Sequence, residues 1–207
     1  MKILASIVLL LAGTIAPSGD RFDDRDPTNP GIKEVLLLGD SVMAGIARSQ
    51  QGKDYLSKHH SYIFGAVGCQ RISTIGCTKS SKMSALEILK LNSGMFKNAL
   101  VISTGYNDFN NASIFRKNVY EICAEAKKQE VLVFWLTYRE AGNVEKKSKA
   151  FNQVLNTESS RIENLRIIDW NSFSTDSKGW FAGDKIHLQG IGPLKMAQFI
   201  SDAIDSI

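Results

Sequence analysis

Five short apolar runs, separated by longer polar segments, constrain the fold of this chain more than any other feature of its sequence. Runs this short and this apolar suit strands that are buried on both faces of a parallel sheet. They are Glu34–Leu38, Ser61–Phe64, Ala99–Ser103, Val131–Leu136 and Leu165–Asp169.

Apolar residues at helical spacing fill the later gaps between these runs. One such face precedes the fourth run (Ile114, Val119, Ile122, Cys123, Ala126), another precedes the fifth (Val144, Phe151, Val154, Leu155), and a third lies near the C-terminus (Leu194, Ala197, Ile200, Ile204). Strands that alternate with helices predict an α/β fold, a three-layer α/β/α sandwich with a five-stranded parallel sheet. Ligands bind at the carboxyl ends of the strands in such sheets, so the residues after each run are the first candidates for a site.

The chain begins with a segment typical of a secretory signal peptide. Met1-Lys2 precedes an apolar run that reaches Ile15, which is shorter than the ~20 residues of a membrane span. We expect a signal peptide over 1–18, a polar linker with two prolines over 19–31, and one domain over 32–207. The alternative is an uncleaved N-terminal anchor. The cleaved form would be secreted or periplasmic, in the cell envelope, with no stable membrane span.

Composition excludes several other classes of protein. The chain has 207 residues, of which 43% are hydrophobic and 22% charged, as in a globular domain. A net charge of +4 without a basic tract does not indicate nucleic acid binding. We expect the basic cluster Lys146, Lys147 and Lys149 to line a solvated helix face. Three cysteines without metal-ligand spacing predict no metal and no disulfide-dense scaffold.

Two strand ends carry polar residues that suit acyl chemistry. Ser41, in Gly39-Asp40-Ser41-Val42, follows the first run at the start of a helix predicted over 43–50, where a backbone N–H can stabilise an oxyanion. Asn107 follows the third run and can donate an amide N–H into the same cleft. Taken singly, Ser41 also suits a helix N-cap and Asn107 a turn.

A third group precedes the C-terminal helix. The spacing of Asp184 and His187 lets the carboxylate accept the imidazole Nδ1–H, which leaves Nε2 free to take a proton. We expect the side chain of Lys185, which lies between them, to point to solvent. His59 and His60 are adjacent in a polar stretch and are predicted to be solvated.

Gly-Asp-Ser, Gly-x-Asn-Asp and Asp-x-x-His, in this order, resemble the SGNH hydrolase superfamily of GDSL-like esterases, from residue 32 to the C-terminus. The resemblance implies the flavodoxin-like SGNH fold, with Ser41 as nucleophile, His187 as general base and Asp184 as the residue that orients His187. It implies an oxyanion hole of the Ser41 N–H, the Asn107 amide and a glycine N–H. Gly68 matches that glycine best and Gly76 is the alternative.

A narrower resemblance links the chain to exported bacterial SGNH domains, some free-standing and some fused to membrane O-acyltransferases. It rests on Val67-Gly68-Cys69-Gln70-Arg71-Ile72 with Cys77, on Trp135-Leu136-Thr137-Tyr138-Arg139-Glu140, and on Asp169-Trp170-Asn171 with Trp180-Phe181. The resemblance implies a disulfide between Cys69 and Cys77 in the loop that carries Gly68, which export makes feasible. Three reduced cysteines in a cytosolic protein are the alternative. Cys123, on an apolar helix face, is expected to be a buried free thiol.

Substrate contacts are also expected near the strand ends. Tyr138 and Trp180 would stack on sugar faces, Arg139 would bind an acidic group, and Asp40 lies beside the nucleophile. Packing at the rim of the site is the alternative for the aromatic residues.

We therefore expect a serine esterase that acts through a Ser-His-Asp triad and an acyl-enzyme on a short-chain, O-acetyl-like ester, on a small molecule or cell-envelope carbohydrate. It would need no cofactor and act as a monomer. The alternatives are an O-acyltransferase with the same triad and an inactive carbohydrate-binding domain.

Overall fold

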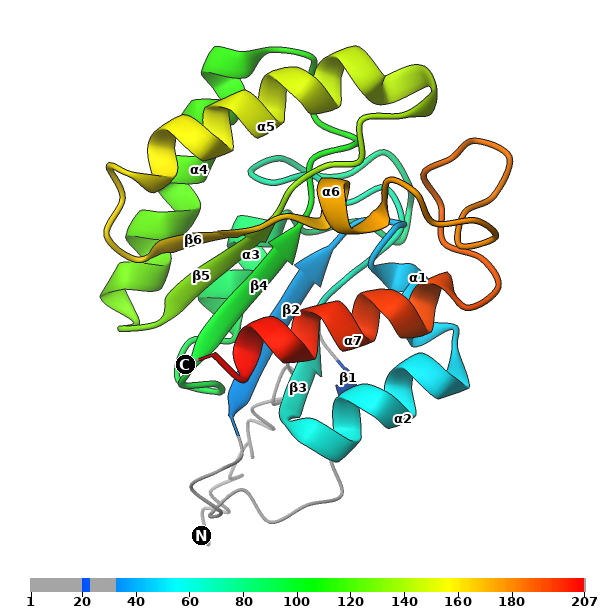
Figure 1. The fold of residues 1–207 in the computed structure, drawn as a ribbon. Coiled ribbons are helices and arrows are strands. Elements are labelled where there is room, and N and C mark those ends of the chain that lie inside the picture. Colours follow the sequence, from blue (N-terminus) through cyan, green and yellow to red (C-terminus); the bar gives the residue numbers. More distant parts are fainter. Residues whose placement is uncertain (1–19, 23–32, 207) are drawn as a thin grey trace, which may run out of the picture.

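The computed structural model describes residues 20–22 and 33–206, which form a sheet covered by helices on both faces (Figure 1). The strand order is β1-β3-β2-β4-β5-β6, and the last five are parallel, as predicted. The strands are β1 (Asp20–Phe22), β2 (Glu34–Gly39), β3 (Ser61–Phe64), β4 (Ala99–Ser103), β5 (Leu132–Leu136) and β6 (Leu165–Ile168). The signal peptide prediction lies outside the described residues.

The sheet carries one strand more than predicted. Within the segment expected to be a linker, Asp20–Phe22 pairs antiparallel with β3, in the register Asp20↔Phe64 to Phe22↔Tyr62. An edge strand leaves a row of backbone N–H and C=O groups unpaired, and a short antiparallel partner satisfies part of that row. A three-residue strand with two charged residues shows no apolar run in the sequence, so periodicity does not reveal it.

Alternate residues of the strands pack into two separate cores. Leu36 and Leu38 of β2 face one core, and Val35 and Leu37 face the other, as the two-residue period of a strand requires. The first core is covered by α3 (Ala85–Leu91), α4 (Ala112–Lys128) and α5 (Glu145–Ser159), the second by α1 (Ala44–Ala47), α2 (Gln50–His59), α6 (Trp170–Ser174) and α7 (Gly192–Ile204).

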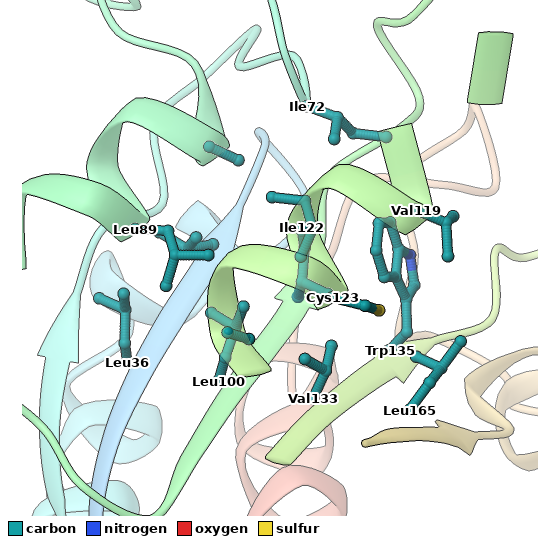
Figure 2. Packing of buried hydrophobic residues seen from close by; sticks show 14 of the residues in the cluster. Leu36, Ile72, Leu89, Leu100, Val119, Ile122, Cys123, Val133, Trp135 and Leu165 are labelled. Carbon is teal, nitrogen blue, oxygen red and sulfur yellow. The ribbon is translucent and has the colours of Figure 1, made fainter. Parts of the chain in front are cut away.

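The first core shows this packing at close range (Figure 2). Leu36, Leu100 and Val133 come from neighbouring strands and face Leu89 of α3 and Ile122 of α4. All five are fully buried, so each contributes about 1.5–3 kcal/mol of burial free energy. Cys123 lies in the same core as a buried free thiol, as predicted, and burial raises its pKa to about 12.

Several helices differ from the sequence predictions. The helix expected over 43–50 is instead α1, which ends at Ala47, because Ser49 adopts an extended backbone and caps α2 by accepting the Gly52 N–H at 3.2 Å. The sequence predictions lack α2 and α6, and they also lack α3, although Ser84 and Glu87 form a capping box at its start.

His60 also differs from its prediction. Its side chain is 3% exposed, and its Nε2 lies 2.7 Å from Asp205 Oδ1 beyond the end of α7. Its Nδ1 accepts the Lys33 N–H at 3.2 Å. The imidazole therefore ties the C-terminal end of the chain to the start of the sheet. None of the helices in residues 33–206 is long and apolar enough to cross a membrane.

Candidate active site

Several loops converge where β2, β3 and β4 end, because these strands are adjacent and in register, with Gly39 opposite Ser103. The loops after β2 and β4, the turn before α5 and the loop before α7 enclose a cavity of about 290 Å³. It is lined by Ser41, Val42, Tyr106, Asn107, Asn143, Val144, Asp184, Ile186 and His187.

Ser41, His187 and Asp184 form a continuous chain of hydrogen bonds at this cavity. Ser41 Oγ lies 2.8 Å from His187 Nε2, and His187 Nδ1 lies 2.5 Å from Asp184 Oδ2. Asp184 Oδ1 accepts the backbone N–H groups of Ile186 and His187, each at 2.9 Å. Burial opposes ionisation of Asp184, but these hydrogen bonds prevail and lower its pKa to about 2. The carboxylate is thus arranged to hold His187 with Nε2 toward the serine.

The loop that carries Asp184 and His187 has little regular structure. An isolated bridge joins Phe181 to Leu188, and the Ala182 N–H donates to the His187 carbonyl at 2.8 Å. The side chains of His187 and Asp184 are 50% and 44% exposed. The Lys185 side chain is exposed, as expected, and its backbone is left-handed, with φ of 65°. This edge of the cavity is open to solvent.

Glycine lets a second element approach this loop closely. Gly142 begins the 3-10 helix η1 (Gly142–Val144), and a Cβ there would overlap the Asp184 carbonyl oxygen. Its φ of 61° is also in the region that favours glycine. The contact places η1 beside the loop that carries Asp184, where Asn143 and Val144 line the cavity.

Two of the three expected oxyanion donors, Ser41 and Asn107, line the cavity, and all three residues are partly buried. Asn107 lines the cavity and its Nδ2 donates to the Gln70 carbonyl at 3.4 Å. Within the described part of the chain, the N–H groups of Ser41 and Gly68 have no hydrogen-bond acceptor, whereas the Gly76 N–H donates to the Ser81 carbonyl at 2.9 Å. Gly68 itself is not among the residues that line the cavity.

A disulfide joins Cys69 to Cys77, with 5.5 Å between their Cα atoms. It closes the loop directly after Gly68. Cys69 has a left-handed backbone, with φ of 64°, and its carbonyl accepts the Cys77 N–H at 3.3 Å. The bond therefore restrains the segment that presents the Gly68 N–H.

Two expected substrate contacts are buried instead. Asp40 is completely buried and accepts the N–H of Val42 at 3.1 Å and of Tyr106 at 3.2 Å, which joins the loops after β2 and β4. Burial raises its pKa to about 6, against the opposing effect of these backbone hydrogen bonds. Tyr138 is 1% exposed and donates its hydroxyl to the Thr104 carbonyl at 2.5 Å. Neither side chain lines the cavity.

Arg139 and Trp180 are partly exposed but also lie away from the cavity lining. The Arg139 guanidinium donates to Ser174 and stacks on the Phe181 ring, 4.1 Å from its centroid. Trp180 stacks on Trp170, with 6.3 Å between ring centroids. Both side chains thus pack within an aromatic cluster beside the His187 loop.

Lys147 corrects a further prediction. We expected it on a solvated helix face with Lys146 and Lys149, which are indeed exposed. Lys147 instead is half-buried, and its Nζ donates to the carbonyls of Tyr106, at 2.5 Å, and Asp108, at 3.3 Å.

Sequence reasoning missed five of the residues that line the cavity: Val42, Tyr106, Asn143, Val144 and Ile186. Three of them lie inside the sequence motifs, directly beside a candidate site residue: Val42, Tyr106 and Ile186. Their position in the sequence could therefore have indicated that they line the site. Asn143 and Val144 carry no such signal. Among the described residues, no cluster of His, Cys, Asp or Glu could hold a metal ion.

No protein-family model and no curated protein matches the sequence, but solved structures match the fold. The C-terminal catalytic domain of Streptococcus pneumoniae peptidoglycan O-acetyltransferase A is 18% identical, with a TM-score of 0.61 over 84% of this chain and 92% of that one. Esterase EstA from Pseudoalteromonas sp. is 16% identical, with a TM-score of 0.64 over 83% and 96%. AlinE4, an SGNH-hydrolase family esterase, is 15% identical, with a TM-score of 0.56 over 85% and 97%.

The architecture is thus that of a three-layer α/β/α sandwich, with the cavity at the carboxyl ends of the strands. More narrowly, the chain has the fold of the SGNH hydrolases, which confirms the fold class predicted from the motifs.

Proposed function

We propose that this protein is a serine esterase that cleaves short-chain esters through an acyl-enzyme. The observation that carries the proposal is the hydrogen-bonded chain from Ser41 Oγ through His187 to Asp184, at a cavity where β2 and β4 end. A nucleophile, a base within hydrogen-bond reach and a third group that orients the base are the parts that acyl transfer requires.

In the proposed mechanism, His187 Nε2 removes the proton of Ser41 as Oγ attacks the ester carbonyl. The oxyanion accepts hydrogen bonds from the Asn107 amide and the N–H groups of Ser41 and Gly68. His187 then protonates the leaving alcohol, and water, activated by the same imidazole, hydrolyses the acyl-enzyme. Asp184 stays ionised throughout, because its pKa is about 2. The hydrogen bond from Gly76 N–H to Ser81 supports Gly68, rather than Gly76, as the glycine donor.

The cavity supports a small acyl group. Its volume of about 290 Å³ is at the lower end of ordinary ligand pockets. The walls include Val42, Tyr106, Val144 and Ile186, which offer apolar surface to an acetyl-sized chain. The solvent-exposed edge near His187 leaves room for a larger alcohol, such as a sugar.

An O-acyltransferase is the second candidate. The similarity to the O-acetyltransferase domain of Streptococcus pneumoniae favours it, as does the exposure of His187, which leaves a sugar hydroxyl as free to approach as water. The two activities share the triad and differ only in the acceptor. Measuring the partition of product between free acid and transferred ester, in the presence of a carbohydrate acceptor, separates them.

We further propose that the domain works outside the cytoplasm, in the cell envelope or medium, where its disulfide is stable. Fractionation with sequencing of the N-terminus tests this. A mature chain that starts near residue 19 supports export, whereas an intact Met1 in the cytoplasmic fraction overturns it.

The esterase proposal is tested with p-nitrophenyl acetate and a fluorophosphonate probe. We expect the wild type to hydrolyse the ester and to be labelled at Ser41. Ser41→Ala should lower kcat by at least about 10³-fold and abolish labelling. Ser113→Ala, at an exposed serine of α4, is the matched control and should behave as wild type. A wild type that neither turns over esters nor takes the label overturns the proposal.

A further inference from the structure

Three consecutive backbone carbonyls around Asn107 all accept hydrogen bonds from cationic side chains. Lys147 Nζ contacts the Tyr106 carbonyl at 2.5 Å and the Asp108 carbonyl at 3.3 Å. Arg71 Nε donates to the carbonyl of Asn107 itself, at 2.9 Å. The two cations come from α5 and from the disulfide-closed loop, so they hold the Asn107 loop from separate elements.

The position of Lys147 is costly, which argues that the contact is specific. Burial lowers the pKa of Lys147, although the nearby carboxylates of Asp108 and Asp40 oppose that shift. An ammonium group gives up hydration only where fixed dipoles or charges replace the water. Lys146 and Lys149, on the same helix, remain exposed, so helix geometry alone does not direct a lysine inward here.

Three consecutive residues of the disulfide-closed loop, Gln70–Ile72, make hydrogen bonds to Asn107 and Asp108. The Asn107 amide donates to the Gln70 carbonyl at 3.4 Å, Arg71 donates to the Asn107 carbonyl, and the Ile72 N–H donates to the Asp108 carboxylate at 3.2 Å. The peptide planes on both sides of Asn107 are therefore held, which fixes the direction in which its side chain leaves the backbone.

We propose that Lys147, together with Arg71, is a positioning residue that aims the Asn107 amide at the oxyanion. This inference rests on the proposed esterase function. An oxyanion donor acts only when it lies about 2.7–3.1 Å from the developing charge, and a displacement of about 1 Å can cost 10²-fold in rate. Lys147 does not line the cavity and makes no hydrogen bond to the proposed triad; its contact with Tyr106 is to the backbone carbonyl. Its effect passes through the backbone of the loop that carries Asn107.

The first test replaces Lys147 with methionine, which keeps the length of the side chain and removes its N–H donors. We expect kcat to fall roughly 10- to 100-fold while KM changes less than about threefold, because the loss falls on transition-state stabilisation. Lys146→Met and Lys149→Met are matched controls on the same helix and should leave both constants at the wild-type values. A wild-type kcat for Lys147→Met overturns the proposal.

A double-mutant cycle separates positioning from general structural support. In an Asn107→Ala background there is no amide left to aim, so adding Lys147→Met should lower kcat by less than about twofold. A full additional 10-fold loss in that background would show that Lys147 acts independently of Asn107 and would overturn the proposal. Arg71→Gln, measured in the same cycle, should likewise lower kcat in the wild-type background but hardly in the Asn107→Ala background. It replaces Lys147→Met as the test if that variant does not fold.

Hydrogen exchange tests the proposal without an ester substrate. Lys147→Met should increase amide exchange in the peptide covering 105–109 by about tenfold or more, while Lys146→Met leaves it unchanged. Unchanged exchange at 105–109 in Lys147→Met overturns the positioning role. An inactive wild type, by contrast, removes the esterase proposal whatever the exchange result, so the two failures are distinguishable.

Discussion

The two sides of the cavity are built differently. Ser41, the proposed nucleophile, and the expected oxyanion donors follow β2, β3 and β4, and buried groups bind their loops to one another. The Asp184–His187 side is a loop outside the sheet, held by one isolated bridge and a few turn hydrogen bonds, with both side chains about half exposed. The carboxylates differ accordingly. Burial raises the pKa of Asp40 and Asp108 to about 6, whereas hydrogen bonds prevail over burial and lower that of Asp184 to about 2.

This difference suits the two proposed tasks, oxyanion stabilisation on the buried side and general-base catalysis on the exposed side. Oxyanion donors must be fixed in place before charge develops, which buried hydrogen bonds to sheet-anchored loops achieve. A general base must accept a proton and pass it on, and its carboxylate partner must remain charged, which an exposed loop allows at little desolvation cost. The comparison predicts that changes on the base side affect activity more than stability, and that changes on the buried side affect both.

The largest expected effect is that of Asp184→Asn on activity. Asparagine keeps an oxygen for the N–H groups of Ile186 and His187, so the loop should stay folded, but its amide presents a donor to His187 Nδ1 and favours the wrong tautomer. We expect kcat for p-nitrophenyl acetate to fall about 10³–10⁴-fold, with a melting temperature only slightly below wild type, because the charge of this exposed carboxylate contributes little stability. Asp176→Asn, at an exposed aspartate after α6, is the control. A large loss of thermal stability in Asp184→Asn would contradict the assignment of this side as structurally independent.

The order of the motifs pointed to the proposed triad and to Asn107 from the sequence alone. Ser41 and Asn107 follow apolar runs that read as strands, so the rule for parallel sheets placed them at one edge. Asp184 and His187 follow no strand, and only their spacing and the family resemblance indicated them. The structure brings all four side chains to one cavity.

The roles of Asp40, Tyr138 and Lys147 could not be predicted in the same way. A residue at a strand end can point into the cavity or into the core, and the choice depends on partners that are distant in sequence. Asp40 turns inward to the N–H of Tyr106, which lies 66 positions away. Lys147 follows the helical spacing of a solvated residue, yet its partners are carbonyls in the loop after β4.

The pH dependence of stability should show the same contrast between the two sides. In the unfolded chain Asp40 and Asp108 ionise near pH 3.8, whereas in the folded protein burial raises the pKa of each to about 6. Between about pH 4 and pH 6 the folded protein therefore holds protons that the unfolded chain has released. The free energy of unfolding should fall as pH rises, by about 3 kcal/mol in all for each carboxyl, of which about 2 kcal/mol is lost between pH 4 and pH 6.

Urea denaturation at pH 4, 5 and 6 tests this dependence. Asp108→Asn should remove about half of the decline. Asp184→Asn is the control and should leave the decline between pH 4 and pH 6 unchanged. Because the pKa of Asp184 is lowered to about 2, its stabilising contribution is constant above about pH 4 and is lost only as pH falls from about 4 to 2. An equal slope in wild type and Asp108→Asn would contradict the assignment of a buried, protonated carboxyl to this loop.

The disulfide should contribute stability on the buried side of the cavity. Replacing both Cys69 and Cys77 with serine should lower the free energy of unfolding by roughly 2–3 kcal/mol, because the unfolded chain is no longer cross-linked. We also expect kcat to fall, because the loop presents Gly68 and Arg71. Dithiothreitol should reproduce the loss in wild type and have no effect on the double variant. Three titratable thiols in unreduced, denatured wild type, instead of Cys123 alone, would show that the bond does not form.

Two glycines, each directly before one of the two cysteines, sharpen the comparison at its smallest scale. A Cβ at Gly76 would overlap the Ser81 side chain and the Cys69 carbonyl, whereas a Cβ at Gly68 would meet no heavy atom within 4 Å. Gly76→Ala should therefore lower the free energy of unfolding by about 1–2 kcal/mol through overpacking. Gly68→Ala should change it by less than about 0.5 kcal/mol. Because Gly68→Ala keeps the backbone N–H, kcat should remain within a few-fold of wild type. Gly68→Ala could instead lose as much activity as Asn107→Ala while its stability stays unchanged. That result would show that glycine occupies this position to leave space for the substrate, and not to present its N–H.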